Sequence, residues 1–197
     1  MNILELFNEC TSGGWTTSGL DVQYKIVQGT LFFQCSHGKS DWRYNLKAYE
    51  NVYTNSDIPF VGHKGFNQLW ESIRHEIESL SFTCIVGYSQ GAAIAVRAHE
   101  NFYHRKGFEP DRTVLFGCPP SIKNPSDELK KRFTNVMNIY NYNDIVFHLP
   151  KLIGYSHVGS LCKLDSYGVC KPSSVKWAEW LSGHSPKQYR QALEIRC

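Results

Sequence analysis

The sequence lacks a long apolar run and a surplus of one charge. Its longest uninterrupted apolar run spans residues 92–96, whereas a membrane-spanning helix needs about 20 such residues. Lysine and arginine number 21 against 18 aspartates and glutamates, which gives a formal net charge of +3, and residues 130–132 form the only basic triplet. A nucleic-acid-binding face needs many clustered basic residues. We therefore expect no transmembrane segment and no nucleic-acid partner.

Cysteine patterns typical of zinc sites and disulfide frameworks are also absent. The sequence has seven cysteines, an odd number, and no two of them form a C-x-x-C pair. The first residues contain no basic segment and place an acid at Glu5, which does not fit a secretory signal. Cysteines of proteins in a reducing compartment are ordinarily free thiols. We expect a cytoplasmic protein with free, mostly buried thiols and no bound metal.

Short β-type runs alternate with helical patterns along the chain. Its 197 residues, of which 42% are hydrophobic and 20% charged, are typical of a single globular domain, here expected to span residues 1–197. The expected strands span residues 23–28, 30–34, 82–87, 112–116, 135–142 and 158–164. The expected helices span residues 1–10, 66–80, 91–101 and 185–195. Residues 124–126 are expected to open a further short helix, with a proline near its first position. Right-handed crossovers place strands that alternate with helices in parallel. The pattern predicts an α/β fold with a mostly parallel central sheet and helices on both faces.

The motif with the most chemical information is Gly87-Tyr88-Ser89-Gln90-Gly91. It follows an expected strand directly and precedes an alanine-rich helix. A serine in G-x-S-x-G between a strand and a helix lies on a strained turn that exposes its Oγ above the sheet, with glycines where the two backbones come close. The helix N-terminus favours negative charge at this point, and the Gln90 N–H is a natural donor to an oxyanion. The alternative is a glycine-flanked serine in an ordinary turn.

A nucleophilic serine needs a general base and an orienting acid, which follow it in the order acid, then histidine. Asp144 follows an expected strand in a loop, and it fits better than Asp127, which lies in the first turn of a helix and suits the helix N-terminus. His184 lies in a loop after all the expected strands and before the final helix. It fits better than His157, which precedes an expected strand. The sequence therefore predicts that Ser89, Asp144 and His184 act together.

Three further segments resemble the class 3 lipases, the fungal-type triacylglycerol lipase family. Residues 63–66 (H-K-G-F) with Trp70 are similar to a helix entry of that family. Residues 143–150 (N-D-I-V-F-H-L-P) are similar to its acid segment, and residues 183–185 (G-H-S) to its terminal histidine segment. The resemblance covers the chain from about residue 31 to its end. It implies an α/β-hydrolase fold, a serine–histidine–aspartate triad and no cofactor.

The same resemblance implies where the second oxyanion donor lies. In the family this donor is a serine or threonine after an early strand, in a segment similar to residues 33–46 (F-Q-C-S-H-G-K-S-D-W-R-Y-N-L). The corresponding residue is Ser36, which would act beside Gln90. Gln34 and Cys35 stand where the family has Arg-Gly, so the turn before Ser36 departs from the family pattern. Four residues are expected to form an apolar flap over the site: Trp42, Tyr44, Leu46 and Tyr49. The alternative is that these four side chains pack on the core.

The predicted function is hydrolysis of carboxylic esters, with lipid esters as the substrate class and transient contact with a lipid surface. Ser89 attacks the acyl carbonyl, His184 accepts its proton and Asp144 orients the imidazole. The N–H groups of Ser36 and Gln90 hold the oxyanion. Water then hydrolyses the acyl-enzyme, so neither a cofactor nor a metal is implied.

Two other functions are also compatible with the sequence. The same triad acts equally well on an amide, a thioester or a phospholipid ester, because pocket shape decides which acyl compound is cleaved. A fold also does not fix a function. A non-catalytic binding protein on the same scaffold is the second alternative, and its support is the departure at Gln34 and Cys35.

Overall fold

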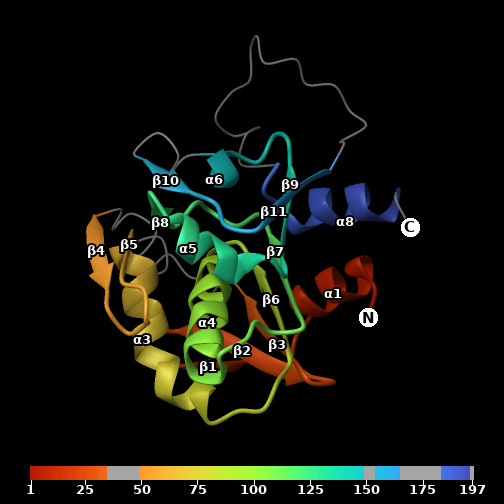
Figure 1. Cartoon of the computed structure of the whole chain (residues 1–197). Helices are drawn as coiled ribbons and strands as arrows, with labels where there is room; N and C mark the ends of the chain where they lie inside the picture. The colour runs from red at the N-terminus through yellow and green to blue at the C-terminus, as the bar shows by residue number, and fades with distance from the viewer. Residues whose placement is uncertain (35–48, 149–153, 165–182, 196–197) are drawn as a thin grey trace.

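The computed structural model describes residues 1–34, 49–148, 154–164 and 183–195. Within these residues seven strands form one sheet in the order β1-β2-β3-β6-β7-β9-β11 (Figure 1). Its strands are β1 (Thr16–Ser18), β2 (Val22–Val27), β3 (Thr30–Gln34), β6 (Cys84–Tyr88), β7 (Arg112–Phe116), β9 (Val136–Asn141) and β11 (Ser160–Leu164). The strands from β3 to β11 are parallel, and β1, β2 and β3 pair antiparallel at one edge. This confirms the predicted mostly parallel central sheet.

Helices cover both faces of this sheet (Figure 1). The helices are α1 (Ile3–Cys10), α3 (Lys64–Glu78), α4 (Gln90–Lys106), α5 (Asp127–Lys130), the 3-10 helix η1 (Lys131–Phe133), α6 (Ile145–His148) and α8 (Pro186–Glu194). Successive strand residues point to opposite faces. Phe32 and Val86 therefore pack in the core that includes residues of α1 and α8, whereas Leu31 and Ile85 pack in the core that includes residues of α3 and α4. The predicted placement of helices on both faces is confirmed.

A second, four-stranded sheet was not predicted. Its order is β10 (Tyr155–Ser156), β8 (Ile122–Lys123), β5 (Phe60–His63) and β4 (Glu50–Tyr53), and all its pairs are antiparallel. Two of these strands have only two residues, too few to show a periodicity. β5 runs straight into α3, where the His63 ring stacks on Phe66 with 4.1 Å between ring centroids. No turn residue stands between β5 and α3, so the sequence gives no sign of where the strand ends and the helix begins.

The helix ends match most of the local sequence signals. Ser185 caps α8 and Pro186 is its first residue, as predicted. The short helix α5 begins later than expected, because Ser126 is its N-cap and Pro125 lies before the cap. The helix α4 runs on to Lys106, beyond the expected end at residue 101. Its last three residues are basic and exposed. The apolar pattern therefore does not extend to the end of the helix, and the predicted end came too early.

The described cysteines carry free thiols, as expected. Cys10 and Cys118 are buried, and Cys84 and Cys162 are partly exposed.

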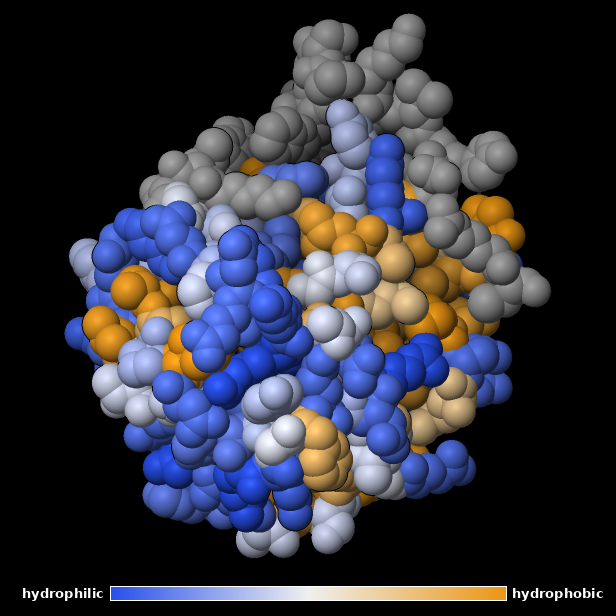
Figure 2. All heavy atoms as spheres, viewed as in Figure 1, coloured by the Kyte–Doolittle hydropathy of each residue, from blue (hydrophilic) through white to orange (hydrophobic). Residues whose placement is uncertain are grey.

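Within the described ranges, no helix has both the length and the apolar composition needed to cross a membrane. Figure 2 shows mainly hydrophilic residues around α3 and α4, whereas apolar residues gather around β9, β11 and α8.

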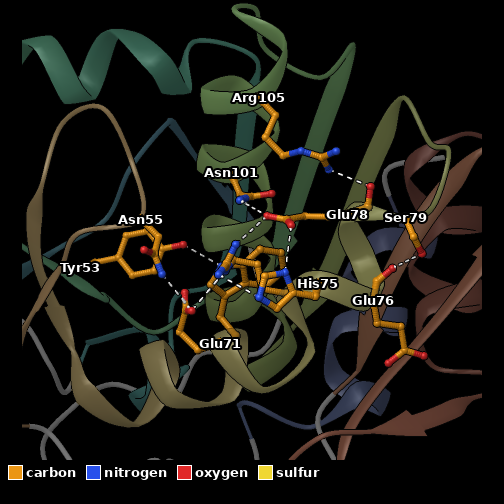
Figure 3. Close-up of polar contacts among 11 residues, drawn as sticks. Tyr53, Asn55, Glu71, His75, Glu76, Glu78, Ser79, Asn101 and Arg105 are labelled. Atoms are coloured by element: carbon orange, nitrogen blue, oxygen red, sulfur yellow. Dashed lines mark hydrogen bonds and ion pairs between the residues drawn. The ribbon is translucent and has the colours of Figure 1, made fainter.

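A polar network joins the end of α3 to α4 (Figure 3). Its centre is Glu78, whose Oε1 accepts hydrogen bonds from Arg74 Nη1 at 3.0 Å and from Asn101 Nδ2 at 2.9 Å. Arg74 Nε also donates to Glu71 Oε2 at 3.2 Å. Arg105 Nη1 donates to the Glu78 carbonyl at 2.8 Å. Since α4 begins directly after Ser89, this network helps to fix the helix that follows the motif serine.

We expect Glu78→Gln to lower the free energy of unfolding at pH 7 by about 1 kcal/mol. Burial acts to raise the pKa of Glu78, but the hydrogen bond from Asn101 and the pairing with Arg74 outweigh it, so the pKa lies below its usual value of 4.5. A carboxyl whose pKa is lowered by folding stabilises the protein fully above its unfolded pKa, and this stabilisation is lost as the pH falls through the lowered folded-state pKa. The difference in free energy of unfolding between the unsubstituted protein and Glu78→Gln should therefore become smaller below pH 4.5. Urea unfolding at a series of pH values measures this difference.

The control for this experiment is Glu128→Gln, which removes an exposed carboxylate from α5. It should lower the free energy of unfolding by less than Glu78→Gln does, because an exposed acid in the first turn of a four-residue helix interacts only weakly with the helix N-terminus. The loss in free energy of unfolding caused by Glu78→Gln could instead stay the same as the solution is made more acidic. That result would show that charge at this position does not stabilise the α3–α4 contact.

Candidate active site

Ser89 lies between the last residue of β6 and the first residue of α4. Its backbone has φ 57° and ψ −124°, a positive φ that is strained for a residue with a side chain. The Ser89 N–H donates to the Phe116 carbonyl of β7 at 2.9 Å. The residue is nearly buried at the edge where the parallel strands end. The strand, strained serine and helix thus follow one another as the motif predicts.

The two glycines of the motif are required by the close approach of neighbouring backbones. A Cβ at Gly87 would lie 2.6 Å from the Ala92 Cα, and a Cβ at Gly91 would lie 2.5 Å from the Phe33 carbonyl oxygen. Real Cβ atoms do not approach other atoms so closely, because the two atoms would overlap sterically. The end of β3 therefore abuts the first turn of α4 directly.

The structure brings Ser89, His184 and Asp144 into contact. His184 Nε2 lies 2.6 Å from Ser89 Oγ, and His184 Nδ1 lies 2.7 Å from Asp144 Oδ2. A carboxylate only accepts hydrogen bonds, so Nδ1 carries the proton and Nε2 is left to accept the serine proton. The imidazole side chain is 15% exposed and the aspartate is fully buried. In this arrangement an imidazole can take the proton of a serine hydroxyl.

Asp144 is held by three further contacts within the protein. Tyr189 of α8 donates its hydroxyl to Asp144 Oδ2 at 2.6 Å, and the Phe147 N–H donates to Oδ1 at 3.2 Å. The Asp144 N–H donates to the Asn141 carbonyl at 3.1 Å. Burial and the negative charge of Asp144 raise the pKa of Tyr189 well above its usual value. The phenol therefore keeps its proton and remains a donor to the carboxylate.

Two glycines leave room for Asp144 and for the loop that carries His184. Gly117 follows β7 with φ 56°, and a Cβ there would lie 2.9 Å from Asp144 Oδ2 and 3.0 Å from His184 Cε1. A Cβ at Gly183 would lie 2.4 Å from the Asn143 carbonyl oxygen. The loop that carries His184 therefore packs directly against the loop that carries Asp144.

The rival residues have partners elsewhere. His157 Nε2 is 3.0 Å from the Phe147 carbonyl oxygen, and the His157 ring stacks on the Phe147 ring with 3.8 Å between centroids. Asp127 lies in the first turn of α5 and pairs with Lys130 at 2.8 Å. His157 therefore contacts α6 and Asp127 contacts Lys130, whereas the Ser89 hydroxyl contacts His184.

Of the two residues predicted to bind an oxyanion, Gln90 and Ser36, the structure describes only Gln90. Gln90 is the first residue of α4, so its backbone N–H lies at the helix N-terminus directly after Ser89. Ser36 lies outside the described residues, as do Cys35 and the flap residues at positions 42, 44 and 46. Tyr49 is described and is 73% exposed, so it does not pack on the core. The second donor and the flap therefore stay predictions.

Sequence reasoning did not assign roles to Tyr189, Asn141 and Gly117. Tyr189 contacts both Asp144 and, at 3.3 Å, the backbone N–H of Asn141. Asn141 Nδ2 in turn donates to the Gly183 carbonyl at 3.1 Å. Only Gly117 left a usable signal, since it directly follows a strand that ends at the same sheet edge as the motif serine. The contacts of the other two depend on how α8 packs, which local sequence does not reveal.

A scan against models of protein families found no match, and neither did a search of curated protein sequences. Several solved structures of fungal lipases, however, resemble this chain. A fungal lipase in complex with an inhibitor matches with a TM-score of 0.61 and 19% identity, over 76% of this chain and 64% of that chain. The triacylglyceride lipase of Rhizomucor miehei matches with a TM-score of 0.62 and 17% identity, over 77% and 65%. The Lip2 lipase of Yarrowia lipolytica matches with a TM-score of 0.56 and 17% identity, over 73% and 62%.

This chain spans less than two thirds of the length of each of those three lipases. The matched part includes most of this chain, and at such low identity the likeness concerns the fold. The chain has the α/β-hydrolase fold of the fungal lipases. The predicted fold class is thereby confirmed.

We expect Gly91→Ala to lower the free energy of unfolding by about 1–3 kcal/mol, because its Cβ would press on the backbone of β3. Gly13→Ala is the matched control, since a Cβ at Gly13 has no neighbour within 4 Å. Urea unfolding of both variants measures the difference. Equal stability of the two variants would contradict the close contact between β3 and α4.

Proposed function

We propose that this chain is a serine hydrolase that cleaves carboxylic esters, with lipid esters as its substrate class. The observation that carries this proposal is the hydrogen-bond chain from Ser89 through His184 to Asp144 at a strained strand-to-helix turn. The fold shared with the Rhizomucor miehei triacylglyceride lipase supports lipid esters as the substrate class. The catalytic residues are Ser89, His184 and Asp144.

The acylation half of the reaction uses all three side chains. Ser89 Oγ attacks the acyl carbon while its proton passes to His184 Nε2, and the carbonyl π electrons move to the oxygen. Asp144 accepts the Nδ1–H throughout and stabilises the imidazolium. The N–H groups of Gln90 and Ser36 stabilise the oxyanion, and each such donor typically lowers the barrier by about 2.7–4 kcal/mol. The tetrahedral intermediate then expels the alcohol, which takes its proton from His184.

Deacylation repeats these steps with water as the nucleophile. His184 Nε2 takes a proton from water as the water oxygen attacks the acyl carbon of the Ser89 ester. The intermediate collapses, the carboxylic acid leaves, and Ser89 Oγ regains its proton from the imidazolium. Each residue ends the cycle in its starting state, and no cofactor takes part in any step of the proposed cycle.

The test is turnover of p-nitrophenyl esters of increasing acyl length by the unsubstituted protein and by Ser89→Ala. We expect Ser89→Ala to lose at least about 10³-fold in kcat/KM, because the nucleophile is removed while the fold is kept. Ser81→Ala changes an exposed serine in the segment before β6 and serves as the control. Equal trace rates for the unsubstituted protein and Ser89→Ala would refute the proposal.

The same assay distinguishes esters from related acyl compounds. A second panel offers a neutral lipid ester, a phospholipid, a thioester and an anilide with one common acyl group. We expect the neutral lipid ester to give the highest kcat/KM, with Ser89 dependence for every compound that is cleaved. Ser89-dependent cleavage that is fastest for a phospholipid or a thioester would support the triad but contradict neutral lipid esters as the preferred substrates.

A further inference from the structure

Tyr88, the residue before the motif serine, contacts the base of the proposed triad in two ways. Its phenol hydroxyl donates a hydrogen bond to the backbone carbonyl of His184. Its ring stacks on the His184 imidazole, with 5.4 Å between ring centroids and 17° between the ring planes. The contact exists because β6 and the loop before α8 meet at the same edge of the sheet.

We propose that Tyr88 is a positioning residue for the His184 base, acting through its hydroxyl on the His184 backbone and through its ring on the imidazole plane. The proposal rests on the proposed function, because it gives His184 the role of general base. It goes beyond the triad in assigning a task to the second residue of the G-x-S-x-G motif. The motif then supplies both the nucleophile and a support for the base.

The hydroxyl contact holds a part of His184 that the triad leaves unfixed. The imidazole contacts Ser89 and Asp144, but its contact with Ser89 changes whenever the serine is acylated. The backbone contacts do not take part in the reaction. Tyr88 holds the His184 carbonyl, and Asn141 Nδ2 holds the preceding carbonyl, that of residue 183, at 3.1 Å. The base therefore keeps its place while its bonds to the substrate change.

The ring contact fixes the plane of the imidazole. Both nitrogens reach their partners only if the imidazole lies in the plane that contains Ser89 Oγ and Asp144 Oδ2. A flat aromatic face stacked nearly parallel to the imidazole opposes rotation out of that plane. Aromatic faces also attract cations, so the same stack favours the imidazolium that forms when His184 takes the serine proton.

Tyr88 is itself held rigidly, as a positioning residue must be. It is 5% exposed and packs edge to face against Phe7 of α1, with 5.7 Å between ring centroids. A second edge contact joins it to Tyr189 of α8 at 5.9 Å. Phe7 is fully buried and also stacks on Tyr189 at 5.7 Å. The residues that support the base and the acid thus share one aromatic cluster under the site.

The test compares Tyr88→Phe, which removes only the hydroxyl, with Tyr88→Leu, which removes the hydroxyl and the ring. We expect Tyr88→Phe to lower kcat about three- to tenfold with KM unchanged, since one hydrogen bond that positions the base is lost. Tyr88→Leu should lower kcat about two- to fivefold more, because the stack is lost as well. Full kcat in Tyr88→Phe would overturn the proposal.

A matched control separates positioning from general packing. Tyr24→Phe removes the hydroxyl of another buried tyrosine, which donates to Glu76 Oε1 at 2.5 Å on the α3 side of the sheet. We expect it to keep the kcat of the unsubstituted protein. A fall in kcat for Tyr24→Phe as large as for Tyr88→Phe would show that any lost phenol contact has this effect, and would contradict the specific role.

A second measurement does not depend on turnover. The Nδ1–H proton of His184 gives an NMR signal that is visible only while its hydrogen bond protects it from exchange with water. We expect this signal to broaden in Tyr88→Phe and to stay sharp in Tyr24→Phe; a sharp signal in both would overturn the proposal. If the unsubstituted protein shows no Ser89-dependent hydrolysis, the proposed function fails, whereas the NMR comparison still decides whether Tyr88 positions His184.

Discussion

The close approach of three backbones around Ser89 is the constraint on which the rest of the site depends. Gly87 lets β6 meet the first turn of α4, and Gly91 lets that turn meet the end of β3. The serine between them takes a positive φ, which raises its Oγ toward the sheet edge where β7 and β9 also end. Without this contact, neither His184 nor the N-terminus of α4 would face the same hydroxyl.

Asp144 and His184 are then held from the face of the sheet opposite to α3 and α4. Tyr189 of α8 donates to Asp144, and Tyr88 of β6 donates to the His184 backbone. Phe7 of α1 packs against both tyrosine rings. The first and last described helices, α1 and α8, lie side by side (Figure 1), and each contributes one ring to the aromatic cluster that contacts Asp144 and the His184 backbone.

The parts of the molecule that could be predicted from the sequence are those whose cause is local. Short apolar and β-branched runs marked β3, β6 and β7, and the glycine spacing around Ser89 marked the strained turn, because each of these features involves residues close in the chain. The small second sheet left no such signal, since its strands are short and its pairing is long-range. The contacts of Tyr189 and Tyr88 were missed for the same reason, as they depend on how α8 and the loop before it pack against the central sheet.

The most direct test of the triad is the reaction of the whole chain with a fluorophosphonate, followed by mass spectrometry of its peptides. A fluorophosphonate is attacked by a serine hydroxyl only when a neighbouring base removes the proton, and fluoride leaves as the phosphorus–oxygen bond forms. We expect one phosphonate adduct, carried by Ser89. An unmodified Ser89 after prolonged exposure, or an adduct on another residue alone, would contradict the triad.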